Sequence, residues 1–86
     1  NKILEAMACG LPVVTTSYGN AGINAKNNVH AAIRDTPDEF ARAVIELLNT
    51  HTQRMALGTE ARILMENEFS WTKRAAELLS IYKNMF

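Results

Sequence analysis

The first sixteen residues, NKILEAMACGLPVVTT, constrain the fold of this chain more than any other stretch. Apolar residues recur three and four positions apart over residues 2–8, which predicts a short helix. Gly10 is placed to end that helix in the left-handed conformation, and Pro12 prevents its continuation. The β-branched run at 13–16 (VVTT) then predicts a strand. A helix followed by a strand in this order is typical of an α/β fold.

The predicted strands are few and short. Because residues 11–14 are continuously apolar, we expect the first strand to be covered on both faces, as in a parallel sheet. Residues 17–28, rich in Gly and Asn, predict a loop, and residues 29–34 (VHAAIR) predict a second short strand. Two strands make a sheet that is marginal alone, and a parallel pair needs a crossover. We therefore expect the remaining strands to lie upstream, in a larger domain.

Helices are predicted for the rest of the chain. Asp35 or Thr36 is placed to cap the first of them, with Pro37 in its first turn and its end near Asn49 or Thr50. Its expected buried stripe consists of Phe40, Ala41, Val44, Ile45, Leu47 and Leu48.

Two more helices are predicted after that one. The first covers about residues 52–67, where Gly58 is expected to cost roughly 1 kcal/mol of helix stability. Ser70 resembles the N-cap of the last helix, with Phe69 before it as a hydrophobic staple and Trp71 packing that helix onto the domain. The expected fold is thus α/β and helix-rich, with two short parallel strands and about four helices.

Length, charge and cysteine content limit the functional classes to which this protein can belong. The 86 residues suffice for a single, partial domain over 1–86, and nine basic residues balance nine acidic ones. Without a basic field we expect no nucleic-acid partner and no membrane contact. The lone Cys9 excludes an internal disulfide and favours a reducing, cytoplasmic location; we expect it to be a small buried hydrophobe. Since position 1 is Asn rather than Met, we expect a segment of a longer protein.

The opening stretch resembles a signature of the retaining glycosyltransferases of the GT-B fold, the large family 4 group (glycosyl transferases group 1). Their usual pattern is a lysine or similar residue, two apolar residues, then E-A-M-A-x-G-x-P-V-V-x-T. The positions that match are Lys2, Glu5, Ala6, Met7, Ala8, Gly10, Pro12, Val13, Val14 and Thr16. Downstream, DTPDEFARAVIELL and RMALGTEARILMENEFSW resemble further family patterns in the same order. The resemblance covers essentially the whole chain and implies the C-terminal portion of a Rossmann-like GT-B domain.

The resemblance implies a binding site for a nucleotide-diphosphate sugar, used as a substrate with no metal or other cofactor. Glu5 matches the second glutamate of the family's E-x7-E motif, which usually accepts hydrogen bonds from the ribose hydroxyls. Such a role suits a carboxylate, which accepts from both hydroxyls of a cis-diol. Asn1 and Lys2 match positions near the diphosphate. The first glutamate would lie upstream of Asn1, so the segment alone is expected to be inactive.

The loop after the first strand departs from the family pattern. Many members have a Gly-Gly pair and a following glutamate there, whereas here Gly19 and Gly22 are separated and no acid follows. The resemblance therefore carries over no donor contact from this loop. No catalytic residue and no metal site is predicted, because no nucleophile-and-base set and no metal-ligand spacing occurs. His30 is expected to be structural or exposed, and His51, at a helix junction, to be a cap rather than a ligand.

Three functional hypotheses remain open at this point. The first is a glycosyltransferase fragment whose parent moves a sugar to a glycan or lipid-linked acceptor. The second is a stand-alone, non-enzymatic α/β module that self-associates through its exposed sheet edge, as a homodimer, or binds a partner. The third is part of a sugar-nucleotide epimerase of GT-B architecture, against which the E-A-M-A and F-S-W motifs argue.

Overall fold

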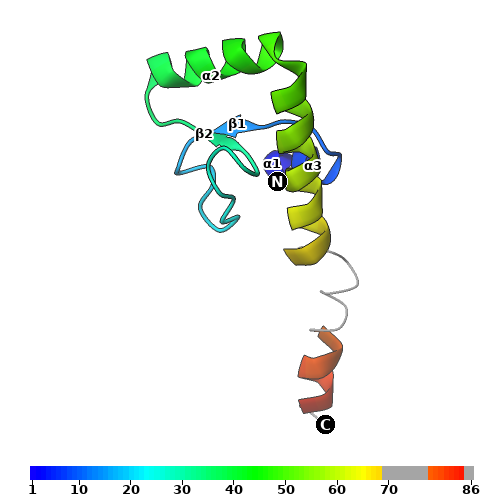
Figure 1. Ribbon diagram of the computed structural model, residues 1–86. Coiled ribbons are helices and arrows are strands. Elements are labelled where there is room, and N and C mark those ends of the chain that lie inside the picture. Colours follow the sequence, from blue (N-terminus) through cyan, green and yellow to red (C-terminus); the bar gives the residue numbers. More distant parts are fainter. Residues whose placement is uncertain (69–77, 85–86) are drawn as a thin grey trace.

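The computed structural model describes residues 1–68 and 78–84 (Figure 1). The elements are α1 (Lys2–Ala8), β1 (Val14–Thr15), β2 (Ala32–Ile33), α2 (Pro37–Asn49) and α3 (His51–Glu68), and residues 78–84 are also helical. Within these ranges, the order confirms the predicted helix-rich α/β fold, with two short strands and four helices. The predictions for Phe69, Ser70 and Trp71 lie outside the described residues.

Both ends of α1 follow from side-chain and glycine chemistry. The Oδ1 atom of Asn1 accepts the backbone N–H of Ile3 at 2.8 Å, which makes Asn1 the N-cap. At the other end Gly10 has φ +74°, as predicted. The N–H groups of Gly10 and Leu11 donate to the carbonyls of Met7 and Ala6, the paired bonds of a Schellman motif. The helix therefore stops cleanly before β1.

The two strands pair in parallel, with Val14 opposite Ala32 and Thr15 opposite Ile33. The N–H of Ala32 donates to the carbonyl of Val13 at 2.9 Å. The second strand is shorter than the predicted 29–34, because its first residues form a turn. The N–H of His30 donates to the carbonyl of Lys26 in that turn, and His30 Nδ1 accepts the N–H of Lys26 at 2.9 Å. Local hydrogen bonds of this kind compete successfully with a strand.

Each face of the strand pair packs against its own hydrophobic cluster. The first cluster lies between the sheet, α1 and α3 and consists of Met7, Val13, Ile23, Ala25, Ala31, Ala61 and Met65. The second lies between the sheet, α2 and α3 and consists of Ala32, Ala43, Leu47 and Leu57, with Val14 packed against it. Because adjacent strand residues point to opposite faces, Val13 and Val14 serve different clusters. Coverage on both faces is confirmed, although Leu11 is 53% exposed.

Helix α2 begins as predicted but buries less than predicted. The hydroxyl of Thr36 accepts the N–H of Glu39 at 3.3 Å, and Pro37 is the first helical residue. Of the residues on α2, only Ala43 and Leu47 are buried. The prediction of a broad buried stripe is therefore wrong for Ala41, Ile45 and Leu48, which are exposed. In the part of the chain that the structure describes, only the narrow face of α2 that carries Ala43 and Leu47 packs against β1 and α3.

Helix α3 packs along α1 at the point where two glycines meet. A side chain at Gly58 would overlap the carbonyl oxygen of Gly10, so the two backbones touch here. The helix-weakening glycine expected in this helix is thus required by packing. Cys9, beside the crossing, is exposed rather than buried as predicted, because it occupies the C-cap of α1 outside the first cluster.

Candidate functional site

Both parallel strands end at the same edge of the sheet, here called the carboxyl edge. Residues 16–20 follow β1 at this edge, and Arg34 and Asp35 follow β2. In open α/β sheets, ligands bind outside the carboxyl ends of the strands. A binding site is therefore expected at the carboxyl edge.

A hydrogen-bonded pair of side chains joins the two strands at this edge. Asp35 Oδ1 accepts the backbone N–H of Ser17 at 2.8 Å, and Asp35 Oδ2 accepts the Ser17 hydroxyl at 2.6 Å. The hydroxyl donor, and after it the backbone donor, hold the pKa of the Asp35 carboxyl below its ordinary value. Sequence reasoning missed this pair. The available signal was that each residue comes directly after a predicted strand.

The loop that follows β1 is tied to the sheet and touches α1. The hydroxyl of Thr16 accepts the N–H of Gly19 at 3.0 Å. A side chain at Gly19 would overlap the hydroxyl of Thr15 and would lie 3.4 Å from Cδ1 of Ile3. Since Ile3 lies in the first turn of α1, that turn stands at the carboxyl edge beside the loop.

The three residues predicted to bind the donor all lie at the start of α1. Lys2 and Glu5 are exposed, and Asn1 is exposed while its side chain caps the helix. Within the described residues, the Glu5 carboxylate has no hydrogen-bond or ion-pair partner, so it is available to a ligand. The structure thus brings Asn1, Lys2 and Glu5 to the edge where ligands bind in such folds. Their contact with a donor stays a prediction.

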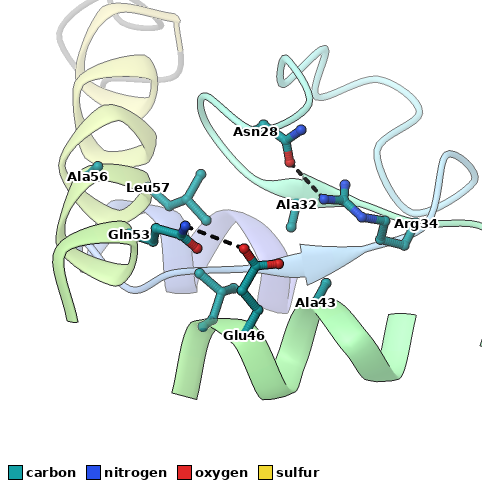
Figure 2. A pocket seen from close by; sticks show the side chains of 9 residues that line it. Asn28, Ala32, Arg34, Ala43, Glu46, Gln53, Ala56 and Leu57 are labelled. Atoms are coloured by element: carbon teal, nitrogen blue, oxygen red, sulfur yellow. Dashed lines mark hydrogen bonds between the residues drawn. The ribbon is translucent and has the colours of Figure 1, made fainter. Parts of the chain in front are cut away.

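A hollow lies between β2, α2 and α3, away from these residues (Figure 2). It has a volume of about 320 Å³. Its polar groups are engaged with one another: Arg34 Nη2 donates to Asn28 Oδ1 at 2.9 Å, and Gln53 Nε2 donates to Glu46 Oε1 at 3.4 Å. None of the predicted site residues lines it.

The described residues hold no group of three or more His, Cys, Asp or Glu side chains placed to bind a metal ion. His30 accepts the N–H of Lys26, which fits a structural role. His51 is the first residue of α3, and its Nδ1 lies 3.4 Å from Arg54 Nη2. None of the helices in the part of the chain that the structure covers has the length and apolarity needed to cross a membrane.

The pair at the carboxyl edge gives a pH-dependent prediction. The pKa of Asp35 is lower in the folded protein than its ordinary 3.8. Its stabilising contribution is therefore complete above pH 3.8 and is lost as the pH falls through the lower folded value. In Ser17→Ala we expect the Asp35 carboxyl to titrate at higher pH, and the melting temperature to fall less steeply below pH 4. Carbon-13 NMR titration and melting curves measure both effects. Ser17→Thr, which keeps the hydroxyl, should titrate like the original, and an unchanged titration in Ser17→Ala would contradict the assignment.

Curated proteins similar to this chain align with nearly all of it. Spore coat protein SA of Bacillus subtilis is 34% identical over 82 residues, or 92% of this chain. The D-inositol 3-phosphate glycosyltransferase of Rhodococcus jostii is 33% identical over 93% of the chain. A GDP-mannose-dependent monoacylated alpha-(1-6)-phosphatidylinositol monomannoside mannosyltransferase of Corynebacterium glutamicum is 30% identical over 94%.

The aligned part is a small share of each relative. The chain spans 22% of the length of spore coat protein SA, 22% of the mannosyltransferase and 18% of the inositol phosphate glycosyltransferase. No solved structure matches the chain significantly. The family described as "Glycosyl transferases group 1" matches residues 1–50, which include α1, both strands and all of α2. The chain belongs to this glycosyltransferase family, as a segment of its GT-B domain.

Proposed function

We propose that the protein containing this segment transfers a sugar, with retention of anomeric configuration, from a nucleotide-diphosphate donor to a glycan or lipid-linked acceptor. The observation that carries the proposal is the place of the family's signature helix. Its first turn, with Glu5, stands at the carboxyl edge of a parallel sheet beside the loop after β1. A donor bound outside this edge would lie near the turn that carries Glu5.

In this proposal Glu5 accepts hydrogen bonds from the donor's ribose hydroxyls. Its carboxylate is exposed and, among the described residues, unpaired, so binding costs no existing contact. The Lys2 ammonium is exposed in the same turn and would attract the diphosphate. The Asn1 side chain caps α1, so its contribution would be to hold the turn in place.

The other details of the proposal come from the resemblance. The transfer would need no metal ion, and the lone cysteine fits a cytoplasmic protein. The first glutamate of the motif and an acceptor-binding domain would be supplied by other parts of the polypeptide. The 86 residues by themselves would then be inactive.

The proposed role of Glu5 is tested by Glu5→Gln in the complete polypeptide. Hydrogen bonds to a charged acceptor contribute about 1.5–3 kcal/mol, so we expect donor affinity to fall about 10- to 100-fold. Titration calorimetry with a panel of nucleotide-diphosphate sugars measures the change. Glu39→Gln removes another first-turn acid, from α2, and should leave the affinity unaltered. If Glu5→Gln only lowers the melting temperature, Glu5 serves the helix dipole and not the donor.

The two alternative functions, epimerisation and self-association, lead to different expected results. Two of the relatives above are named as glycosyltransferases, which favours sugar transfer over epimerisation. Self-association has some support from Ile45 and Leu48, which are 58% and 70% exposed on α2. Light scattering on the complete polypeptide measures whether it self-associates. A stable dimer that binds no nucleotide sugar would favour the module over the transferase.

A further inference from the structure

One aromatic residue stands almost fully in solvent at the carboxyl edge. Tyr18, in the loop after β1, is 92% exposed. Single exposed apolar residues are common on protein surfaces, and Ile45 and Leu48 are examples on α2. Tyr18 differs from them in two ways, which are its place at the edge and the rigidity of the backbone that presents it.

The backbone on both sides of Tyr18 is fixed. Ser17 before it is held by two hydrogen bonds to Asp35, at 2.8 and 2.6 Å. Gly19 after it donates to the hydroxyl of Thr16 and has no room for a side chain. The carbonyl of Tyr18 itself accepts the N–H of Ala21 at 3.1 Å. The ring is thus carried by an ordered loop, and only its two side-chain torsions remain to be fixed on binding.

The same loop stands beside the helix that carries Glu5. Gly19 adjoins Ile3 in the first turn of α1, because a Cβ added to Gly19 would lie 3.4 Å from Ile3 Cδ1. A ligand held by Glu5 at the carboxyl edge would therefore lie near the loop. The ring of Tyr18 offers a flat apolar face and a hydroxyl at low entropic cost, a combination suited to the flat faces of sugars and nucleobases.

We propose that Tyr18 is a donor-binding residue whose ring packs against a ring of the nucleotide-diphosphate sugar at the carboxyl edge. This inference rests on the proposed function and deepens it by adding a contact from the loop after β1. That loop departs from the family pattern, with Gly19 and Gly22 separated. The contact would thus belong to this chain and to relatives that share its aromatic residue.

The test compares three variants of the complete polypeptide by calorimetry and donor kinetics. Because stacking on an aromatic ring strengthens binding, Tyr18→Ala should weaken donor binding by about 10-fold with an unchanged melting temperature. Tyr18→Phe keeps the ring and should bind nearly as the original. Leu48→Ala truncates another exposed apolar side chain, on α2, and should have no effect.

Two ligands distinguish which ring is contacted. If Tyr18→Ala weakens binding of the free nucleoside diphosphate, the ring packs on the base. If it weakens binding of the nucleotide sugar alone, the ring packs on the sugar. Either result supports the inference.

Two results would overturn the inference. One is an unchanged donor affinity and KM in Tyr18→Ala. The other is a lowered melting temperature without loss of affinity, which would place the ring in packing against other parts of the polypeptide. The original protein provides the separate check on the proposed function. If it binds none of the nucleotide sugars, that function fails; if it binds one and Tyr18→Ala binds equally well, the inference alone fails.

Discussion

Gly58→Ala is expected to destabilise the protein by about 2 kcal/mol or more, although alanine favours a helix by about 1 kcal/mol over glycine. The reason is the crossing of α1 and α3. The new Cβ would overlap the carbonyl oxygen of Gly10 and lie 3.0 Å from its carbonyl carbon. Backbone atoms cannot rotate away as a flexible side chain can. The helices would have to separate, which would open the first cluster around Ala61.

Urea denaturation of the complete polypeptide measures this effect. Thr59→Ala is the matched control, since it raises helix propensity at the neighbouring, exposed position without adding an atom near Gly10. We expect it to change the free energy of unfolding by less than about 0.5 kcal/mol. A Gly58→Ala protein as stable as the control would show that the two backbones do not touch.

Met7→Ala is expected to cost about 2–5 kcal/mol. Met7 is fully buried, with 0% exposure, and lies in the first cluster between α1, the sheet and α3. Removing its side chain leaves a cavity that the surrounding residues fill only in part. Because α1 carries Glu5, we also expect the variant to bind the proposed donor more weakly.

Met55→Ala is the control for replacing a helical methionine by alanine without loss of buried packing. Met55 lies on α3 and is 57% exposed, so its truncation should alter the free energy of unfolding by about 0.5 kcal/mol or less. Equal effects of the two truncations would contradict the burial of Met7. The difference between them isolates packing from the intrinsic helix preferences of Met and Ala.

The sequence predicted those parts of the fold that depend on neighbouring residues. The helix over 2–8, the left-handed Gly10 and the cap at Thr36 each follow from a few consecutive side chains. The predictions that failed depend on distant packing. Nothing within residues 29–34 reveals that His30 closes a turn with Lys26. Likewise, the exposure of Ile45 depends on which elements lie beside α2.

The position of the candidate site was predictable in part, and its binding role stays a prediction. The family motif pointed to Glu5, Lys2 and Asn1, and the structure places their turn at the carboxyl edge. The link between Ser17 and Asp35 spans eighteen positions in the sequence, so it becomes visible only when the two strands are paired. The fixed presentation of Tyr18 follows from this link and was hidden for the same reason.

The separation of the two hydrophobic clusters affects which amino-acid substitutions this segment tolerates. Val13 and Val14 are neighbours in sequence, yet one packs with Met7 and the other beside Leu47. A substitution around Leu47 therefore leaves the immediate neighbours of Met7 unchanged. We therefore expect substitutions on the α2 side to disturb the helix that carries Glu5 less than substitutions around Met7. Such changes would reach that helix only through the strands and α3, which both clusters share.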